Sequence, residues 1–181
     1  TGNPSGQDYG CNITNSSSSY RLKGTPTEWT GTIFTIQFWF RPDSGSSAVN
    51  NMVLFSTSED DAAGDSLHIL QDQSDIKVTQ RISGGESTLI TATAAVTDHS
   101  ESTWYYVCLT HDGATNTMTL YTGNNEGDGV SPYPTLTSNN NASVTTDTTF
   151  TNYVVGFDTI TGHAQFKGSV SILRIFDNVL D

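Results

Sequence analysis

Residues 34 to 42, with the sequence FTIQFWFRP, alternate strictly between two kinds of side chain. The apolar set is Phe34, Ile36, Phe38 and Phe40, and the intervening set is Thr35, Gln37, Trp39 and Arg41. Successive side chains of a strand point to opposite faces of a sheet, so the pattern predicts a strand with the apolar set in the core. The other face then carries a large tryptophan among polar groups, which indicates either a ligand-binding surface or further packing.

Short runs of the same kind continue through most of the chain. Turn segments such as DSGSS, SGGE and HDGATN separate them, and no long window has helical periodicity. The predicted strands are 8–13, 19–23, 33–41, 51–56, 66–71, 75–81, 87–93, 104–111, 117–122, 150–157 and 169–176. Many short strands with Gly-rich turns predict an all-β, antiparallel sandwich of about 10 to 13 strands.

One stretch departs from this spacing. Residues 123–148 show little periodicity, and we expect a functional or mobile loop there. No internal repeat or linker is evident, so we expect a single domain over residues 1–181, as a module of a larger extracellular protein flanked by other domains. The side chains predicted to lie between the sheets are Phe34, Ile36, Phe38, Phe40, Leu54, Leu67, Ile69, Val107, Leu109, Met118, Leu120, Val155, Leu173 and Ile175.

The charge balance narrows the range of partners. Lys and Arg number 7 against 19 acidic residues, which gives a formal net charge of −12. Phosphate backbones and anionic membrane surfaces would be repelled, so nucleic acid and membranes are excluded as expected partners. No apolar run is long enough for a transmembrane helix, and we expect no membrane insertion. Cations are compatible ligands for a chain of this charge.

The two cysteines, Cys11 and Cys108, form no CxxC motif, which gives no support to a zinc or redox motif. They would form one disulfide or remain buried free thiols, and the sequence leaves both alternatives open. Sequons begin at Asn12, Asn15 and Asn141, and these are candidate glycosylation sites for a secreted chain. In a chain so rich in Asn, Ser and Thr, sequons also arise by chance. The composition favours an extracellular setting or a cell or virion surface.

Four segments resemble, in order, the motifs of laminin-G-like domains. FTIQFWFRP at 34–42 resembles the FTxxxWxxP strand, and WYYVCLTHDGATNTMTLYTG at 104–123 resembles the WxxVxxTxDG…xxLYxxG hairpin. VVGFD at 154–158 resembles xxIGxD, and FKGSVSILRIFDNVLD at 166–181 resembles the closing FxGxIDEVRIYxxxLs strand. The chain is thereby similar to the concanavalin A-like lectin and glucanase superfamily, in its laminin-G and pentraxin branch. This resemblance implies a jelly-roll sandwich of two curved antiparallel sheets.

The pentraxin resemblance extends to Cys108, but the pentraxin partner cysteine would fall at Gln37, which leaves Cys11 as the replacement. A second departure is Ser171–Ile172, where laminin-G-like domains often carry two acidic residues. The resemblance also implies a calcium site at the loop rim, built from Asp65 and Asp158 with added charge from Asp60 and Asp61. Calcium is accordingly the expected cofactor, at a weak single-ion site of the kind found in extracellular modules. The alternative is a solvated acidic turn.

The chemistry of the enzymes in this superfamily is not evident in the sequence. Retaining glycosidases need two carboxylates about 5 Å apart, and the ExDxxE strand of the glucanases is missing, as are the RxEL and QIH signatures of the lyases. The histidines share no metal-ligand spacing in sequence, and we expect polar contacts for each: His68, His99, His111 and His163. We therefore expect no enzyme activity.

A binding module is the function that the sequence favours. If the alternation holds, Gln37 and Trp39 share one face with Trp104, Tyr106, Cys108 and Thr110 of the neighbouring strand. Aromatic rings beside hydrogen-bonding groups suit the stacking of sugar rings, so the candidate ligand-binding residues are Gln37, Trp39, Trp104 and Tyr106. We expect a module that binds carbohydrate or mediates adhesion, with a glycan or an extracellular protein as its partner. Calcium-assisted binding is compatible with this expectation. The alternative is a structural module of a surface fibre or a multidomain adhesin, in contact with protein neighbours.

Overall fold

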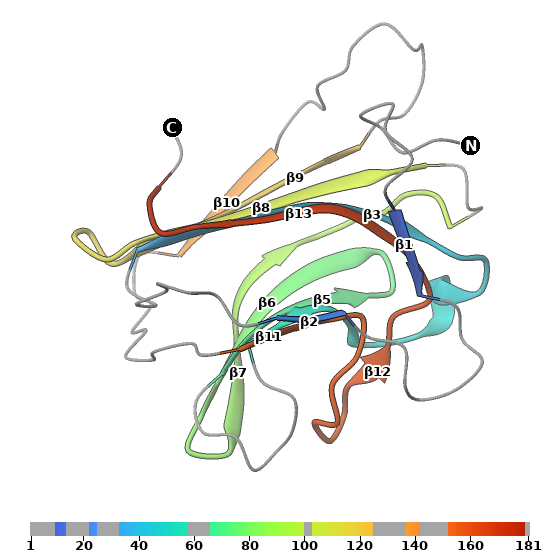
Figure 1. Ribbon diagram of the computed structural model, residues 1–181, viewed down its shortest axis with the longest axis horizontal. Coiled ribbons are helices and arrows are strands. Elements are labelled where there is room, and N and C mark those ends of the chain that lie inside the picture. Colours follow the sequence, from blue (N-terminus) through green and yellow to red (C-terminus); the bar gives the residue numbers. More distant parts are fainter. Residues whose placement is uncertain are drawn as a thin grey trace, which may run out of the picture.

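A computed structural model describes residues 10–13, 22–24, 33–57, 66–99, 103–124, 137–141 and 152–179. Over these residues the chain forms two antiparallel sheets that lie face to face (Figure 1). The only helical element there is η1, a single 3-10 turn at Ser46–Ala48. None of the helical structure in the described part is long and apolar enough to cross a membrane. The predicted all-β sandwich of the jelly-roll type is therefore confirmed.

Within the described residues the first sheet has six strands, and every neighbouring pair in it is antiparallel. In spatial order they are β1 (Gly10–Ile13), β13 (Gly168–Phe176), β3 (Phe34–Pro42), β8 (Tyr105–Asp112), β9 (Thr117–Asn124) and β10 (Thr137–Asn141). The strand closest to the carboxyl end therefore lies between two of the earliest strands. Figure 1 shows this sheet as the upper layer.

The second sheet, as far as the chain is described, has seven strands and forms the lower layer of Figure 1. Its main order is β2 (Leu22–Gly24), β11 (Tyr153–Val155), β4 (Met52–Ser56), β5 (Ser66–Asp72), β6 (Asp75–Ile82) and β7 (Gly85–Ala92). The short β12 (Ala164–Gln165) pairs with β4 in parallel. Consecutive strands β4 to β7 form a meander, while β11 and β12 return from far along the chain to its edge.

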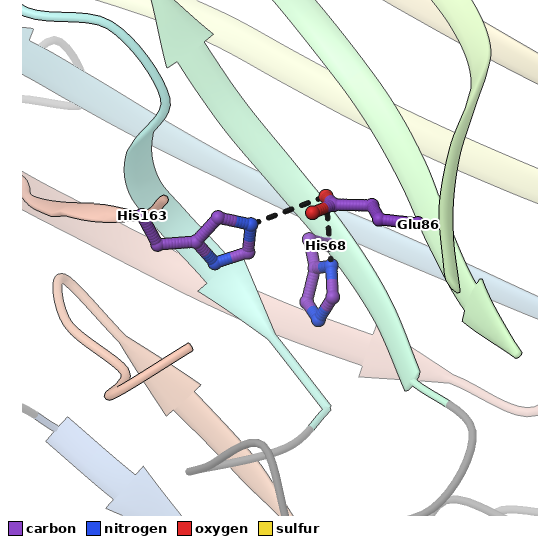
Figure 2. Close-up of side chains that lie close together, drawn as sticks. All are labelled: His68, Glu86 and His163. Atoms are coloured by element: carbon purple, nitrogen blue, oxygen red, sulfur yellow. Dashed lines mark hydrogen bonds and ion pairs between the residues drawn. The ribbon is translucent and has the colours of Figure 1, made fainter. Parts of the chain in front are cut away.

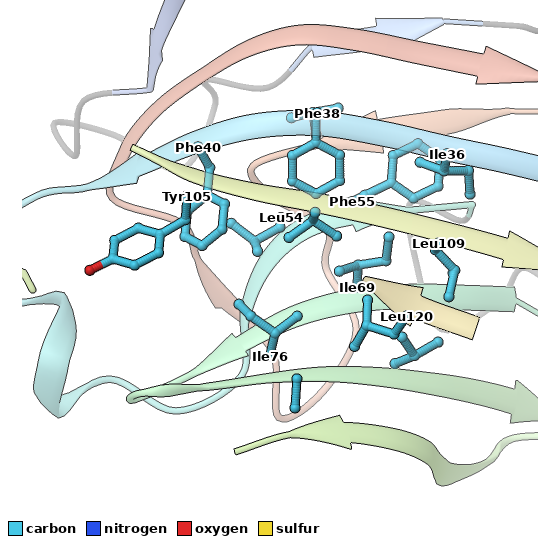
Figure 3. Close-up of a cluster of buried hydrophobic side chains, with 14 of the residues drawn as sticks. Ile36, Phe38, Phe40, Leu54, Phe55, Ile69, Ile76, Tyr105, Leu109 and Leu120 are labelled. Carbon is cyan, nitrogen blue, oxygen red and sulfur yellow. The ribbon is translucent and has the colours of Figure 1, made fainter. Parts of the chain in front are cut away.

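The core lies between the two sheets and contains the side chains that alternation assigned to it (Figure 3). All the predicted core residues are buried except Leu173 and Ile175, which are partly buried and pack against the core. Their lower burial coincides with a β-bulge in β13 between Ser171 and Arg174, where Ile172 has a φ of 54°. The extra residue interrupts the pairing with β3 and bends the strand locally.

The prediction of a loop over residues 123–148 is wrong in part. β9 extends to Asn124, and β10 occupies Thr137–Asn141. The sequence of β10, TSNNN, is polar and has no alternation. It forms a strand because it lies at the edge of the sheet, where pairing of its backbone with β9 is sufficient.

Candidate functional site

The outer surface of the six-stranded sheet, which faces away from the core, carries side chains in rows that cross the strands. Residues paired across neighbouring strands share one face. Two adjacent rows follow from the registers, namely Arg174, Gln37, Cys108, Tyr121 and then Ser171, Trp39, Tyr106, Gly123. We call Gln37, Trp39, Tyr106, Tyr121 and Arg174 the aromatic face. It joins three members of the sequence-predicted set with two residues that the sequence alone did not single out.

Tyr106 is at the centre of the aromatic face. Its ring lies 5.2 Å from that of Trp39, at an interplanar angle of 53°, and its hydroxyl donates a 2.5 Å hydrogen bond to Oε1 of Gln37. Burial raises the pKa of this hydroxyl, so it stays a neutral donor. Opposite Tyr106 on β9 is Gly123, which has no side chain to cover the ring. Tyr106 and Gln37 are both half-buried.

The two predicted tryptophans are less accessible than Tyr106. Trp39 is 9% exposed and Trp104 is 7% exposed. The guanidinium carbon of Arg41 lies 5.3 Å from the ring centroid of Trp104, a cation–π contact that holds both side chains in place. These observations support the packing alternative for the tryptophans. Tyr106 and Gln37 keep exposed surface, and Arg174 beside Gln37 is exposed.

Cys108 is a buried free thiol. It pairs directly with Gln37, as the pentraxin resemblance implied. Cys11 pairs with Val170, Val170 pairs with Phe40, and Phe40 pairs with Tyr105. Strands β13 and β3 therefore both separate the two cysteines. Strands lie about 4.8 Å apart, and this separation is far beyond the Cα distance that a disulfide allows. Of the two alternatives left by the sequence, the structure shows the free thiol for Cys108.

The outer surface of the seven-stranded sheet carries a second group of polar side chains. We call His68, Thr79, Glu86, Asp158 and His163 the histidine–carboxylate cluster. Between the core residues of β5, His68 points to the outer face, where Thr79 of β6 is its cross-strand partner. Glu86 is the second residue of β7 and lies on the same side. Asp158 and His163 come from the loop between β11 and β12, which descends from the lower layer in Figure 1.

This loop owes its shape to backbone features at its two ends. Gly156 and Gly162 have φ values of 89° and 94°, a conformation that favours glycine. Between them Oδ1 of Asp158 accepts a 3.1 Å hydrogen bond from the backbone N–H of Ile160. Asp158 is 1% exposed and Ile160 is 2% exposed. The loop therefore packs down onto the sheet and presents His163 to it.

His163 lies between two carboxylates. Its Nδ1 is 2.9 Å and 3.0 Å from the two oxygens of Asp158, and its Nε2 is 3.1 Å from Oε1 of Glu86. Burial lowers the pKa of His163, but the hydrogen bonds and charges of Asp158 and Glu86 outweigh it and raise this pKa to about 9. Hydrogen bonding to His163 in turn holds the pKa of Glu86 well below its usual range. In this arrangement both ring nitrogens of His163 donate.

Thr79 and His68 complete the cluster. The Thr79 hydroxyl donates a 2.5 Å hydrogen bond to Oε1 of Glu86 and lies 3.1 Å from Nδ1 of His68. The rings of His68 and His163 meet edge to face, with centroids 4.8 Å apart. Figure 2 shows both imidazoles directed at the Glu86 carboxylate. The His68 and His163 side chains are 0% and 1% exposed, whereas Glu86 is 29% exposed, so the cluster opens on the Glu86 side.

The remaining sequence-predicted site residues are only partly described. Asp60, Asp61, Asp65 and Asn15 lie outside the described residues, whereas Asn12 is in β1 and Asn141 is in β10. Asp158, the fourth predicted calcium ligand, has both carboxylate oxygens on His163. The calcium site and the occupancy of the sequons stay predictions.

Sequence reasoning did not find the histidine–carboxylate cluster. Residues 68, 86 and 163 are far apart in sequence, so no motif spacing links His68, Glu86 and His163. One available signal was the position of His68 in SLHILQ, opposite the core-facing residues of the strand. The other was the histidine that follows VVGFD in a loop already expected at the rim. Only the sheet order brings these positions together.

Family membership follows from residues 14–181, which match the concanavalin A-like lectin/glucanases superfamily. The chain belongs to this superfamily. The laminin-G-like resemblance of the four strand motifs is confirmed. No protein of curated function matches the sequence.

Solved structures show the same fold at low sequence identity. The mouse laminin α1 chain, domains LG4-5, is 17% identical with a TM-score of 0.56, over 86% of this chain and 37% of that one. A binding domain of botulinum neurotoxin DC in complex with SialylT is 17% identical with a TM-score of 0.55, over 89% and 37%. The enzymatically active domain of tailspike protein 2 of bacteriophage CBA120 is 12% identical with a TM-score of 0.59, over 91% and 25%. The chain thus spans well under half of each.

Proposed function

We propose that this chain is a non-catalytic carbohydrate-binding module that works outside the cell or on a cell or virion surface. The observation that carries the proposal is the aromatic face, where Tyr106 is fixed by the Trp39 ring and by Gln37. A preorganised aromatic ring beside hydrogen-bonding groups suits the apolar face and the hydroxyls of a sugar. The superfamily and the neurotoxin binding domain solved with SialylT support the carbohydrate reading.

Arg174 gives the aromatic face a charged end. It is exposed and pairs with Gln37 across β13 and β3. A guanidinium offers a planar fork of donors that matches a carboxylate. Within a chain of net charge −12, this local cation favours glycans whose acidic group reaches Arg174 while a neighbouring ring lies on Tyr106.

The arrangement of the two carboxylates in the histidine–carboxylate cluster supports a non-catalytic function. A retaining glycosidase holds two carboxylates about 5 Å apart on either side of the scissile bond. Here His163 occupies the space between Asp158 and Glu86 and hydrogen-bonds to both. The tailspike domain has the same fold and is enzymatically active, so hydrolysis of any bound glycan belongs among the outcomes to be measured.

A glycan array, run with calcium and with chelator, tests the proposal. We expect the wild-type chain to bind a defined set of glycans, and Arg174→Ala to lose the acidic members. Lys23→Ala is the matched control because it removes one exposed cation from β2 in the opposite sheet, and it should bind like wild type. Stronger glycan binding with calcium than with chelator would support calcium-assisted binding. If no glycan binds in either condition, the structural or adhesive role in contact with protein neighbours replaces it.

A further inference from the structure

The histidine–carboxylate cluster holds nitrogen and oxygen atoms at the spacing of metal ligands. One ligand atom from each of His68, Glu86 and His163 lies within 4.8 Å of the others. Oε1 of Glu86 is 3.1 Å from Nε2 of His163 and 3.6 Å from Nδ1 of His68. Ligand atoms about 2.0–2.1 Å from a tetrahedral zinc ion are roughly 3.4 Å apart. The two distances from Glu86 lie on either side of that value, so small shifts of the side chains would accommodate an ion.

Two further residues orient the ligands. Asp158 accepts from Nδ1 of His163 with both oxygens, which fixes the ring and directs Nε2 at Glu86. Histidines that bind metals commonly donate their other nitrogen to a carboxylate in this way. Thr79 donates to Oε1 of Glu86 and so fixes that carboxylate as well. The cluster therefore has supporting contacts beyond the three ligand side chains.

His68 is a buried histidine that meets the cluster through one ring nitrogen. Its side chain is 0% exposed, and its buried Nε2 has no hydrogen-bond partner among the described residues. The nitrogen available to a metal is Nδ1, which faces Glu86, whereas Nε2 points away from the cluster (Figure 2).

The identity of the ligand atoms selects the class of metal. Imidazole nitrogens suit zinc, copper, iron and nickel, whereas calcium takes six to eight oxygens. We propose that His68, Glu86 and His163 bind one divalent transition metal ion of the zinc class, with Asp158 and Thr79 as positioning residues. The ion takes the place of the protons that Nδ1 of His68 and Nε2 of His163 carry in the metal-free cluster, and these protons are released on binding. A fourth position, on the partly exposed Glu86 side, is left for water or an exogenous ligand. This site is on the opposite sheet from the aromatic face and does not depend on glycan binding.

Calorimetric titration of the full, chelator-treated chain with Zn²⁺ tests the proposal. We expect one ion per chain for wild type, with affinity at least tenfold weaker in Glu86→Gln, which keeps the size of the side chain and one acceptor oxygen but removes the charge. His99→Gln is the matched control because His99 is a partly buried histidine that bonds Ser46 in another part of the molecule. Its affinity for Zn²⁺ should equal that of wild type.

X-ray absorption at the zinc edge on the wild-type complex makes the test independent of any variant. Two imidazole nitrogens at about 2.0–2.1 Å together with a carboxylate oxygen support the site. Absence of stoichiometric binding, a spectrum without imidazole ligands, or equal affinity in wild type and a folded Glu86→Gln variant would each overturn it. The cluster would then be a buried ion-paired network only.

Discussion

Phe38 illustrates how much one side chain contributes to the sandwich. It is 1% exposed, and its ring centroid lies 6.4 Å from that of Phe40 in the same core cluster. Truncation removes buried apolar surface and leaves a cavity, so Phe38→Ala should lower the free energy of unfolding by about 3–5 kcal/mol. Urea denaturation measures this. Ile82→Ala, at a side chain that is 46% exposed, should change it by less than about 0.5 kcal/mol. A loss under about 1 kcal/mol for Phe38→Ala would contradict the register.

Gly168 is required for a close backbone approach at the start of β13. Its φ is 153°, and a Cβ there would lie 2.1 Å from the carbonyl oxygen of Arg41 and 2.6 Å from the Phe166 ring. Gly168→Ala should therefore lower the midpoint of thermal unfolding by several degrees. Gly84→Ala is the control, because Gly84 has a φ of 84° but open space around its Cβ position. It should cost only the backbone strain, about 1 kcal/mol. Equal effects of the two substitutions would rule out the steric explanation.

His163 should make stability depend on pH when chelator keeps metal ions away. Its pKa is 6.5 in ordinary surroundings and about 9 in the fold, so the folded state binds the proton more tightly. The stabilisation is complete below about pH 6.5 and is lost as pH rises through about 9, by up to about 3 kcal/mol. Urea denaturation between pH 6 and 10 should show this decline, and Glu86→Gln should make it smaller. A flat profile in the wild type would contradict the ion-paired arrangement.

At the scale of single elements, the pairing of β3 with β8 is open to a covalent test. Gln37 and Cys108 are directly opposite, and opposed residues of antiparallel strands have Cα atoms about 4.5–5.5 Å apart, within disulfide range. Gln37→Cys should therefore form a disulfide with Cys108 under mild oxidation and stabilise the fold by about 2–4 kcal/mol. Peptide mapping by mass spectrometry identifies the bond, and Gln37→Ser is the control. A bond from the introduced thiol to Cys11 would show that the sheet order is wrong.

The elements with clear alternation could be predicted from the sequence, and those held by pairing alone could not. β3 and β8 carry apolar residues at every second position, and this pattern sufficed to assign both their faces. β10 has the sequence TSNNN and exists because β9 pairs with it. The bulge at Ile172 shifts the alternation of core-side residues from Val170 to Leu173 and Ile175, and a prediction from strict alternation does not anticipate such a shift.

At the scale of the molecule, the candidate sites differ in how far sequence reasoning could reach them. The aromatic face was accessible because Gln37, Trp39 and Tyr106 lie on two strands whose motifs are recognisable. The extent of the face could not be predicted, because the exposure of Trp39 depends on all the residues that pack around it. The histidine–carboxylate cluster draws on β5, β7 and the loop before β12, which meet only when the seven-stranded sheet has formed. Local sequence patterns contain no information on contacts between segments so far apart in the chain.

The central claim is that glycans bind on the aromatic face, and NMR mapping of the binding surface tests it most directly. The strongest glycan from the array would be titrated into isotope-labelled protein while backbone amide shifts are followed. The account predicts that the largest shifts fall on β3, β8 and β13 around Gln37, Tyr106 and Arg174, and that Tyr106→Ala weakens binding by about tenfold or more, a loss of about 1.4 kcal/mol. Shifts confined to the seven-stranded sheet or to the loops, with unchanged affinity in Tyr106→Ala, would contradict it.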